Sequence, residues 1–168
     1  MSTQLRVIAV IIVVFLLQIT LFAGVRIDGV APELPLLLSI LISLHVGAER
    51  SIVIGFVIGF AYDLALGTPL GLWALVCCLA AYPFGVASAH LDRTSGTGLW
   101  LLGGLLSASG IIGFAIAGAM VGRTDLLRGL GHVVVVATGF NLLLSPVLGR
   151  GVRWAFASGG RVRTVMTR

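Results

Sequence analysis

Residues 47–71, GAERSIVIGFVIGFAYDLALGTPLG, place a small residue or an acid at every fourth position. These positions are Gly47, Ser51, Gly55, Gly59, Asp63, Gly67 and Gly71. Residues four apart lie on nearly the same face of an α-helix, about 40° apart at ~3.6 residues per turn. The spacing therefore predicts a helix with one face that lacks bulky side chains. In lipid such a face lets helix backbones approach closely, and it suits either packing within the chain or docking of another protein's helix.

The composition of the whole chain indicates a membrane protein. Of the 168 residues, 58% are hydrophobic and 10% are charged, whereas soluble domains carry about 25% charged residues. A soluble fold of this length still exposes roughly a third of its unfolded-chain surface, and the polar residues here are too few to cover it. The composition excludes a soluble globular domain and a disordered chain.

Six apolar runs predict an all-α polytopic membrane protein that forms one six-helix domain. The approximate spans are residues 7–25, 31–46, 51–66, 69–91, 99–121 and 130–148, followed by a basic cytoplasmic tail at 149–168. A span needs about 20 apolar residues, so the second run is short, and we expect Pro32 to start its helix. Four residues separate the second and third runs, which indicates a tight helical hairpin.

The arginine distribution predicts the orientation of the spans. All 11 cationic residues are arginine. With a cytoplasmic N-terminus, eight of them lie on the inner side and three on the outer side, as the positive-inside rule requires. Both termini are therefore expected in the cytoplasm. The tail arginines are expected to contact anionic lipids, with a specific cytoplasmic docking site as the alternative; they are Arg150, Arg153, Arg161, Arg163 and Arg168.

Asp63 lies inside an apolar run, near the outer end of its predicted helix. A carboxylate near a helix C-terminus is disfavoured by the macrodipole, so its position requires an explanation. One interpretation is that Asp63 reaches the water at the membrane interface and ties the following turn, in which Thr68 N-caps the next helix and Pro69 begins it. The other is a polar contact for a partner helix or a ligand.

Reactive side chains form no catalytic or metal-binding pattern. The three histidines are far apart, and the two cysteines are adjacent to each other inside an apolar run. No serine is paired with a histidine and an acid, and the chain contains no lysine for a phosphate-binding loop. We therefore expect no catalytic residues, metal or cofactor, and we expect Asn141 to bond to a neighbouring helix.

Four segments between Pro32 and Gly85 carry a family pattern. They are Pro32–Leu34, Gly55–Leu64, Gly67–Leu72 and Ala81–Gly85. Their order, G-x-x-x-G, then D-L, then G-x-P-L-G before an apolar helix, resembles the rod shape-determining MreD family over about a third of the chain.

The resemblance implies a non-catalytic scaffold or regulator of cell elongation and peptidoglycan synthesis in the bacterial inner membrane. Family members associate with MreC, a single-span protein, and act beside MreB, RodA and a class B transpeptidase. The resemblance also implies a fold like that of the substrate-binding subunits of energy-coupling-factor transporters. The residues expected to pack helices or to meet the partner are Gly55, Gly59, Asp63, Gly67, Pro69 and Gly71.

The alternative function is a small-solute (vitamin-like) binding subunit of a membrane transporter. Such subunits typically present an A-x-x-x-A pattern on the first helix to their coupling partner. The first span contains Ala9 and Ala23 but no such pair, and polar side chains are sparse in the spans. Both observations favour the scaffold.

Overall fold

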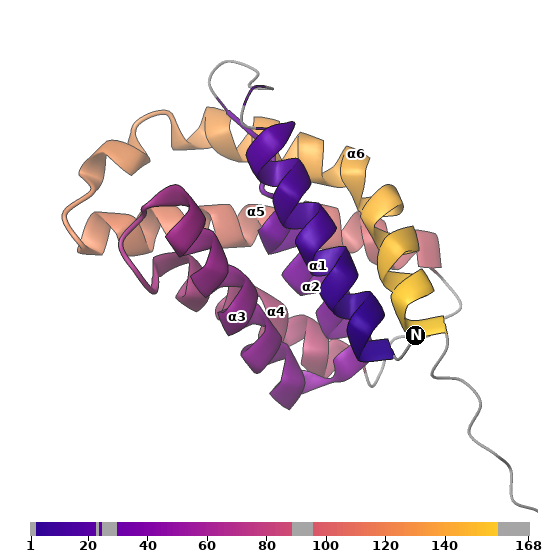
Figure 1. Ribbon diagram of the computed structural model, residues 1–168. Coiled ribbons are helices and arrows are strands. Elements are labelled where there is room, and N and C mark those ends of the chain that lie inside the picture. The colour runs from indigo at the N-terminus through magenta and orange to yellow at the C-terminus, as the bar shows by residue number, and fades with distance from the viewer. Residues whose placement is uncertain (1–2, 23, 25–29, 89–95, 158–168) are drawn as a thin grey trace, which may run out of the picture.

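The computed structural model describes residues 3–22, 24, 30–88 and 96–157, which form helices and their connections (Figure 1). The helices are α1 (Thr3–Thr20), α2 (Leu34–Val46), α3 (Ala48–Leu66), α4 (Leu72–Ala87), α5 (Gly96–Met120), the short 3-10 helix η1 (Thr124–Leu127) and α6 (Leu130–Phe156). The all-helical class expected from the sequence is confirmed for these residues.

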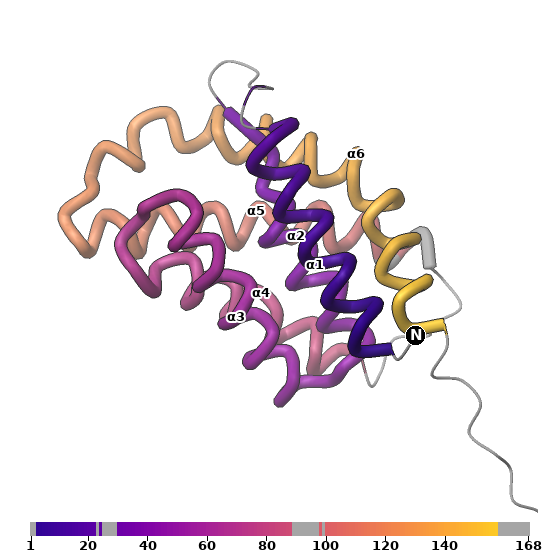
Figure 2. Tube along the Cα trace, in the orientation of Figure 1, coloured from indigo at the N-terminus to yellow at the C-terminus, as the bar shows by residue number. Residues whose placement is uncertain are grey.

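The helix connections gather at two opposite ends of the molecule. Figure 2 shows the N-terminus, the α2–α3 junction and the end of α6 at one end. The α3–α4 turn and η1 lie at the other end. We call them the inner and the outer end, after the orientation that the arginines predict.

Three of the described helices are long and apolar enough to cross a membrane, namely α1, the Trp100–Met120 part of α5, and α6. The other apolar helices, α2 and α4, have 13 and 16 residues, or about 20 and 24 Å at ~1.5 Å per residue. The hydrocarbon layer is about 30 Å thick. Helix α3 carries Glu49, Arg50 and Asp63. Three described helices thus meet the length and composition of a membrane span, and the count of six spans stays a prediction.

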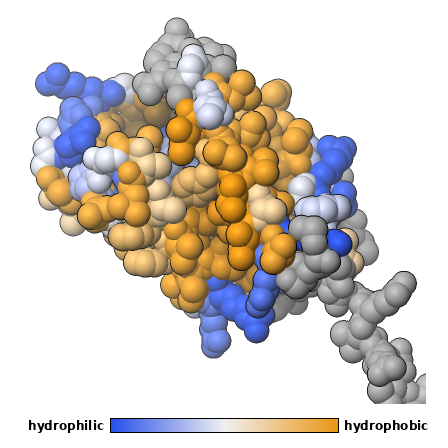
Figure 3. Space-filling view, viewed as in Figure 1, coloured by the Kyte–Doolittle hydropathy of each residue, from blue (hydrophilic) through white to orange (hydrophobic). Residues whose placement is uncertain are grey.

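Helix α2 forms the centre of the bundle. Every residue from Leu34 to Leu44 is buried, and α2 contacts each of the other five α-helices. A helix that is apolar on all sides needs such a position. Around it, α1 and α3 expose large aliphatic side chains, and Figure 3 shows this apolar surface with hydrophilic residues at its margins.

Two predicted helix starts are wrong. Helix α2 begins at Leu34 rather than at Pro32, and Pro35 occupies its first turn. Helix α4 begins at Leu72 rather than at Pro69. Gly67 and Gly71 adopt positive φ angles of 65° and 96°, which glycine tolerates best, so the chain is still turning between them.

The last helix is longer than the predicted span. It continues through Phe156 and so includes the first part of the predicted tail. Val152 and Ala155 are buried there, and this packing extends the helix. Arg150 and Arg153 are consequently helical residues, while Arg161, Arg163 and Arg168 lie outside the described part of the chain.

The small residues of α3 face α4, and this is the most extensive helix pair in the described structure. A Cβ atom at Gly55 would lie 2.8 Å from the carbonyl oxygen of Cys77. At Gly59 it would overlap the carbonyl oxygen of Trp73 and lie 2.5 Å from the Cα atom of Ala74. Backbone cannot yield as a side chain does, so these positions require glycine.

We expect Gly59→Ala to lower the free energy of unfolding by about 3 kcal/mol, because the added methyl group overlaps backbone of α4. Gly139→Ala on α6 is the matched control, since a Cβ atom there meets nothing within 4 Å. It should be neutral or slightly stabilising, by up to about 1 kcal/mol. Thermal unfolding in detergent measures both, and equal stability of the two variants would contradict the close α3–α4 packing.

Candidate functional site

The carboxylate of Asp63 joins the end of α3 to the start of α4. Its side chain is fully buried. It accepts hydrogen bonds from the Thr68 hydroxyl at 2.6 Å and from the backbone N–H groups of Gly71, Trp73 and Ala74 at 2.9, 3.1 and 3.3 Å. The interpretation that Asp63 ties the turn is confirmed. The expectation that Asp63 reaches the interface water is wrong, because its side chain is fully buried.

This arrangement makes Asp63 the cap of α4. The first N–H groups of a helix have no partner within the helix, and an anion at that end is favoured by the helix dipole. The prediction that Thr68 caps α4 is wrong, because its hydroxyl donates to Asp63 while Gly71 occupies the N-cap position. Asp63 is tolerated at the C-terminal end of α3 because its charge stabilises the N-terminal end of α4.

Three other residues that we expected to pack helices or to meet a partner lie in the turn between α3 and α4. They are Gly67, Pro69 and Gly71. Gly67 ends α3 in a left-handed conformation. Pro69 and Gly71 line a groove of about 510 Å³ beside the hairpin. Its other lining residues are Phe56, Leu70, Leu72, Leu75, Cys78 and Val121. We call it the hairpin groove.

A second polar cluster surrounds the start of α2. The Gln18 amide donates to the carbonyl oxygen of Pro32 at 3.0 Å and accepts from the N–H group of Leu34 at 3.2 Å. The N–H group of Glu33 donates to the Asn141 side-chain oxygen at 3.2 Å. Non-helical backbone at membrane depth is tolerated only where protein groups satisfy it, and these two amides do so.

Asn141 also donates to the hydroxyl of Ser107 on α5 at 2.9 Å, so its expected bond to a neighbouring helix is confirmed. The role of Gln18 was not predicted, nor was the hydrogen bond from the Tyr62 hydroxyl to the Glu33 carboxylate. Gln18 interrupts the apolar run of α1 at a buried position, and this interruption is the signal that identifies it.

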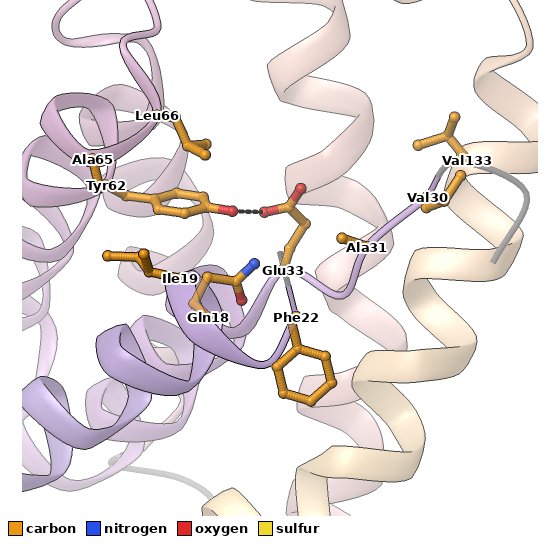
Figure 4. Close-up of a pocket in the computed structure, with 10 residues that line it drawn as sticks. All are labelled: Gln18, Ile19, Phe22, Val30, Ala31, Glu33, Tyr62, Ala65, Leu66 and Val133. Carbon is orange, nitrogen blue, oxygen red and sulfur yellow. Dashed lines mark hydrogen bonds between the residues drawn. The ribbon is translucent and has the colours of Figure 1, made fainter. Parts of the chain in front are cut away.

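A cavity of about 430 Å³ opens beside this cluster at the outer end (Figure 4). Tyr62 and Glu33 point toward each other, and the Tyr62 hydroxyl donates to the Glu33 carboxylate at 2.7 Å. Gln18 lies next to them. The remaining lining residues are apolar: Ile19, Phe22, Val30, Ala31, Ala65, Leu66 and Val133.

Arginines near the inner end lie over tryptophan rings. The guanidinium carbon of Arg6 is 5.0 Å from the centre of the Trp154 ring. Those of Arg150 and Arg153 are 5.8 and 4.4 Å from the centre of the Trp100 ring. Arg150 and Arg153, two of the predicted lipid-binding arginines, thus both lie over the Trp100 ring.

Arg123 forms an ion pair with Asp125 at the outer end, with 3.3 Å between the charged atoms. The Arg123 hydrogen bond lowers the pKa of Asp125 below its usual value. Both side chains are exposed, so the pair adds little to stability. Within the described ranges, no group of three or more histidine, cysteine, aspartate or glutamate residues is placed to hold a metal ion.

Comparison with known families gives a match to the rod shape-determining protein MreD over residues 1–124. The chain belongs to the MreD family. No curated protein and no solved structure matches it. The match covers α1 to α5 and therefore includes both Asp63 and the glycines that bring α3 against α4.

Membership in the MreD family implies a role in rod shape determination. The family has no known enzymatic activity. The G-x-x-x-G and D-L positions that carried the resemblance now have a physical reason in this MreD-family chain: Gly55 and Gly59 allow the close approach, and Asp63 caps α4 across it.

We expect Asp63→Ala to lower the free energy of unfolding by about 3 kcal/mol or more, because three backbone N–H groups lose their acceptor in a buried site. Asp63→Asn keeps one acceptor oxygen and should fall between the wild type and Asp63→Ala. Thermal unfolding in detergent measures the relative stability of the wild type and the two variants. An Asp63→Ala variant as stable as the wild type would show that these hydrogen bonds contribute nothing.

Proposed function

We propose that this chain is a non-catalytic scaffold or regulator of the cell-elongation and peptidoglycan-synthesis machinery in the bacterial inner membrane. The family match supports a place in shape determination. The polar groups described above are engaged in fixing helix ends to one another, as in Asp63 with α4 and Gln18 with α2. A bundle organised in this way is suited to presenting fixed apolar faces to the helices of other proteins.

The proposal includes six membrane spans with both termini in the cytoplasm. The arginine distribution supports this orientation. Gln18 and Asn141 support the crossing of the short α2, because they satisfy the backbone of Pro32, Glu33 and Leu34 at the start of the helix. The likeness to the substrate-binding subunits of energy-coupling-factor transporters stays a prediction.

Reporter fusions test the topology. We expect signals that alternate between outside and inside, beginning outside, because successive connections lie on opposite sides of the membrane. The fusion points are Arg26, Arg50, Thr68, Arg93, Arg128 and Arg168. A periplasmic signal at Arg168 would contradict the proposed orientation.

The hairpin groove is the surface that we propose for the transmembrane helix of a single-span partner such as MreC. Gly55 and Gly59 are occupied by α4 of the same chain, so the partner would contact the exposed side of the α3–α4 hairpin, where Phe56 and Leu75 line the groove. Phe56 is 51% exposed there and stacks on Phe60, with 5.8 Å between the ring centres. Large aromatic side chains commonly anchor interfaces.

The rigidity of the groove also supports docking. Its wall includes the turn that Asp63 holds through Thr68 and Gly71. A surface that is already ordered loses less conformational entropy when a partner binds. MreB, RodA and the class B transpeptidase are the other proposed members of the same machinery.

We expect Phe56→Ala combined with Leu75→Ala to reduce partner retention about tenfold, equivalent to about 1.4 kcal/mol of lost packing. Both side chains are about half exposed, so the stability of the chain should change little. Leu64→Ala combined with Leu143→Ala is the control, since both leucines are exposed outside the groove. Co-purification from native membranes measures retention, and equal retention by the two double variants would rule out the hairpin groove.

A second candidate function is binding of a small solute, and the cavity at the outer end is the observation that favours it. Its polar groups also hold the fold together: Gln18 bonds to the backbone around Pro32, and one carboxylate oxygen of Glu33 accepts from Tyr62. These side chains thus have a structural role that needs no solute. The scaffold therefore remains the better supported function.

A further inference from the structure

A second apolar groove lies between α1 and α6. It has a volume of about 360 Å³ and is almost wholly apolar. Its lining residues are Ala9, Val10, Val13, Val14, Leu17, Val147, Leu148, Gly151 and Trp154. The groove extends from Ala9 to Leu17, or about 12 Å along α1 at ~1.5 Å per residue.

The inner end of this groove carries a cation. Arg6 lies over Trp154, which is itself a wall of the groove and is 53% exposed. The Nε atom of Arg6 is buried, and no acceptor among the described residues bonds to it. No carboxylate of the described chain pairs with Arg6 either. The guanidinium is thus placed to receive an anion from outside the chain.

We propose that the groove between α1 and α6 binds one anionic glycerophospholipid, with an acyl chain along the groove and the phosphate at Arg6. The proposed topology assigns this lipid to the inner leaflet. The length supports this occupant, because about 12 Å corresponds to less than one leaflet of a hydrocarbon layer about 30 Å thick.

The charge and the width of the groove also support a lipid. A phosphate would balance the charge of the Arg6 guanidinium, which forms no ion pair among the described residues, and arginine suits phosphate recognition. A transmembrane helix is about 10 Å wide and must cross both leaflets, whereas this groove ends at Leu17, next to the inward-facing Gln18. An acyl chain is narrower and ends within its own leaflet.

Trp154 serves as the reporter in the test. The purified full-length chain is reconstituted in phosphatidylcholine vesicles that contain a fixed fraction of brominated phosphatidylglycerol or, in a parallel sample, of brominated phosphatidylcholine. Bromine quenches a neighbouring indole, and subtraction of the Trp154→Phe signal isolates Trp154. We expect the anionic lipid to associate about fivefold more strongly, as ~1 kcal/mol per arginine near the headgroups implies.

Two variants separate the headgroup contact from the acyl-chain contact. Arg6→Gln should bring the preference for phosphatidylglycerol close to one, whereas Arg50→Gln, an exposed arginine elsewhere at the inner end, should leave it unchanged. Gly151→Leu fills the groove without a backbone clash and should reduce quenching by both lipids. Gly139→Leu, on the same helix but outside the groove, is its control.

Equal quenching by the two lipids in the wild type, or a preference that survives Arg6→Gln, would overturn the proposal. It would also be overturned if Gly151→Leu left the quenching unchanged and abolished partner retention, because a protein helix would then be the occupant. The result is independent of the hairpin groove, since the two grooves share no residue. If Gly151→Leu unfolds, Val147→Phe at an exposed groove position replaces it.

Discussion

The buried carboxylate of Asp63 at the start of α4 is the interaction on which the hairpin of α3 and α4 depends. In a bilayer the first N–H groups of a helix find no water, so a protein group must accept their hydrogen bonds. Asp63 accepts from Gly71, Trp73 and Ala74. It reaches them only because the glycines of α3 let the two backbones approach closely. The Asp63 carboxylate and the glycines of α3 therefore act together to hold α3 against α4.

The same constraint recurs at the start of α2. There the neutral amides of Gln18 and Asn141 satisfy the backbone around Glu33. These bonds come from α1 and α6, so they fix the central helix to the outer ones. With α2 and the hairpin held in this way, the outward faces of the bundle keep a defined shape. A scaffold for other membrane helices requires that property.

Sequence reasoning found the parts of this structure that depend on local spacing. The four-residue period placed Gly55, Gly59 and Asp63 on one face of a helix, and the tie from Asp63 to the following turn spans only a few residues. The cap of α4 was attributed to Thr68 because capping preferences describe the residue next to the helix. Here the acceptor comes from the preceding helix.

Local sequence patterns could not predict the contacts between residues that are far apart in the chain. The bond from Glu33 to Asn141 joins residues 108 positions apart, and no local pattern specifies that partner. The groove at Arg6 likewise requires the antiparallel register of α1 and α6. A lone arginine at the start of an apolar run indicates topology, whereas its place over Trp154 emerges only when the helices pack.

Amide hydrogen exchange in the wild-type chain tests the role of Asp63 most directly. The N–H groups of Gly71, Trp73 and Ala74 belong to the cap and first turn of α4, where amides ordinarily exchange fast because they lack partners within the helix. If the Asp63 carboxylate holds them, the amides of Trp73 and Ala74 will exchange as slowly as those in the middle of α4. Exchange at the rate of a frayed helix end would contradict the account.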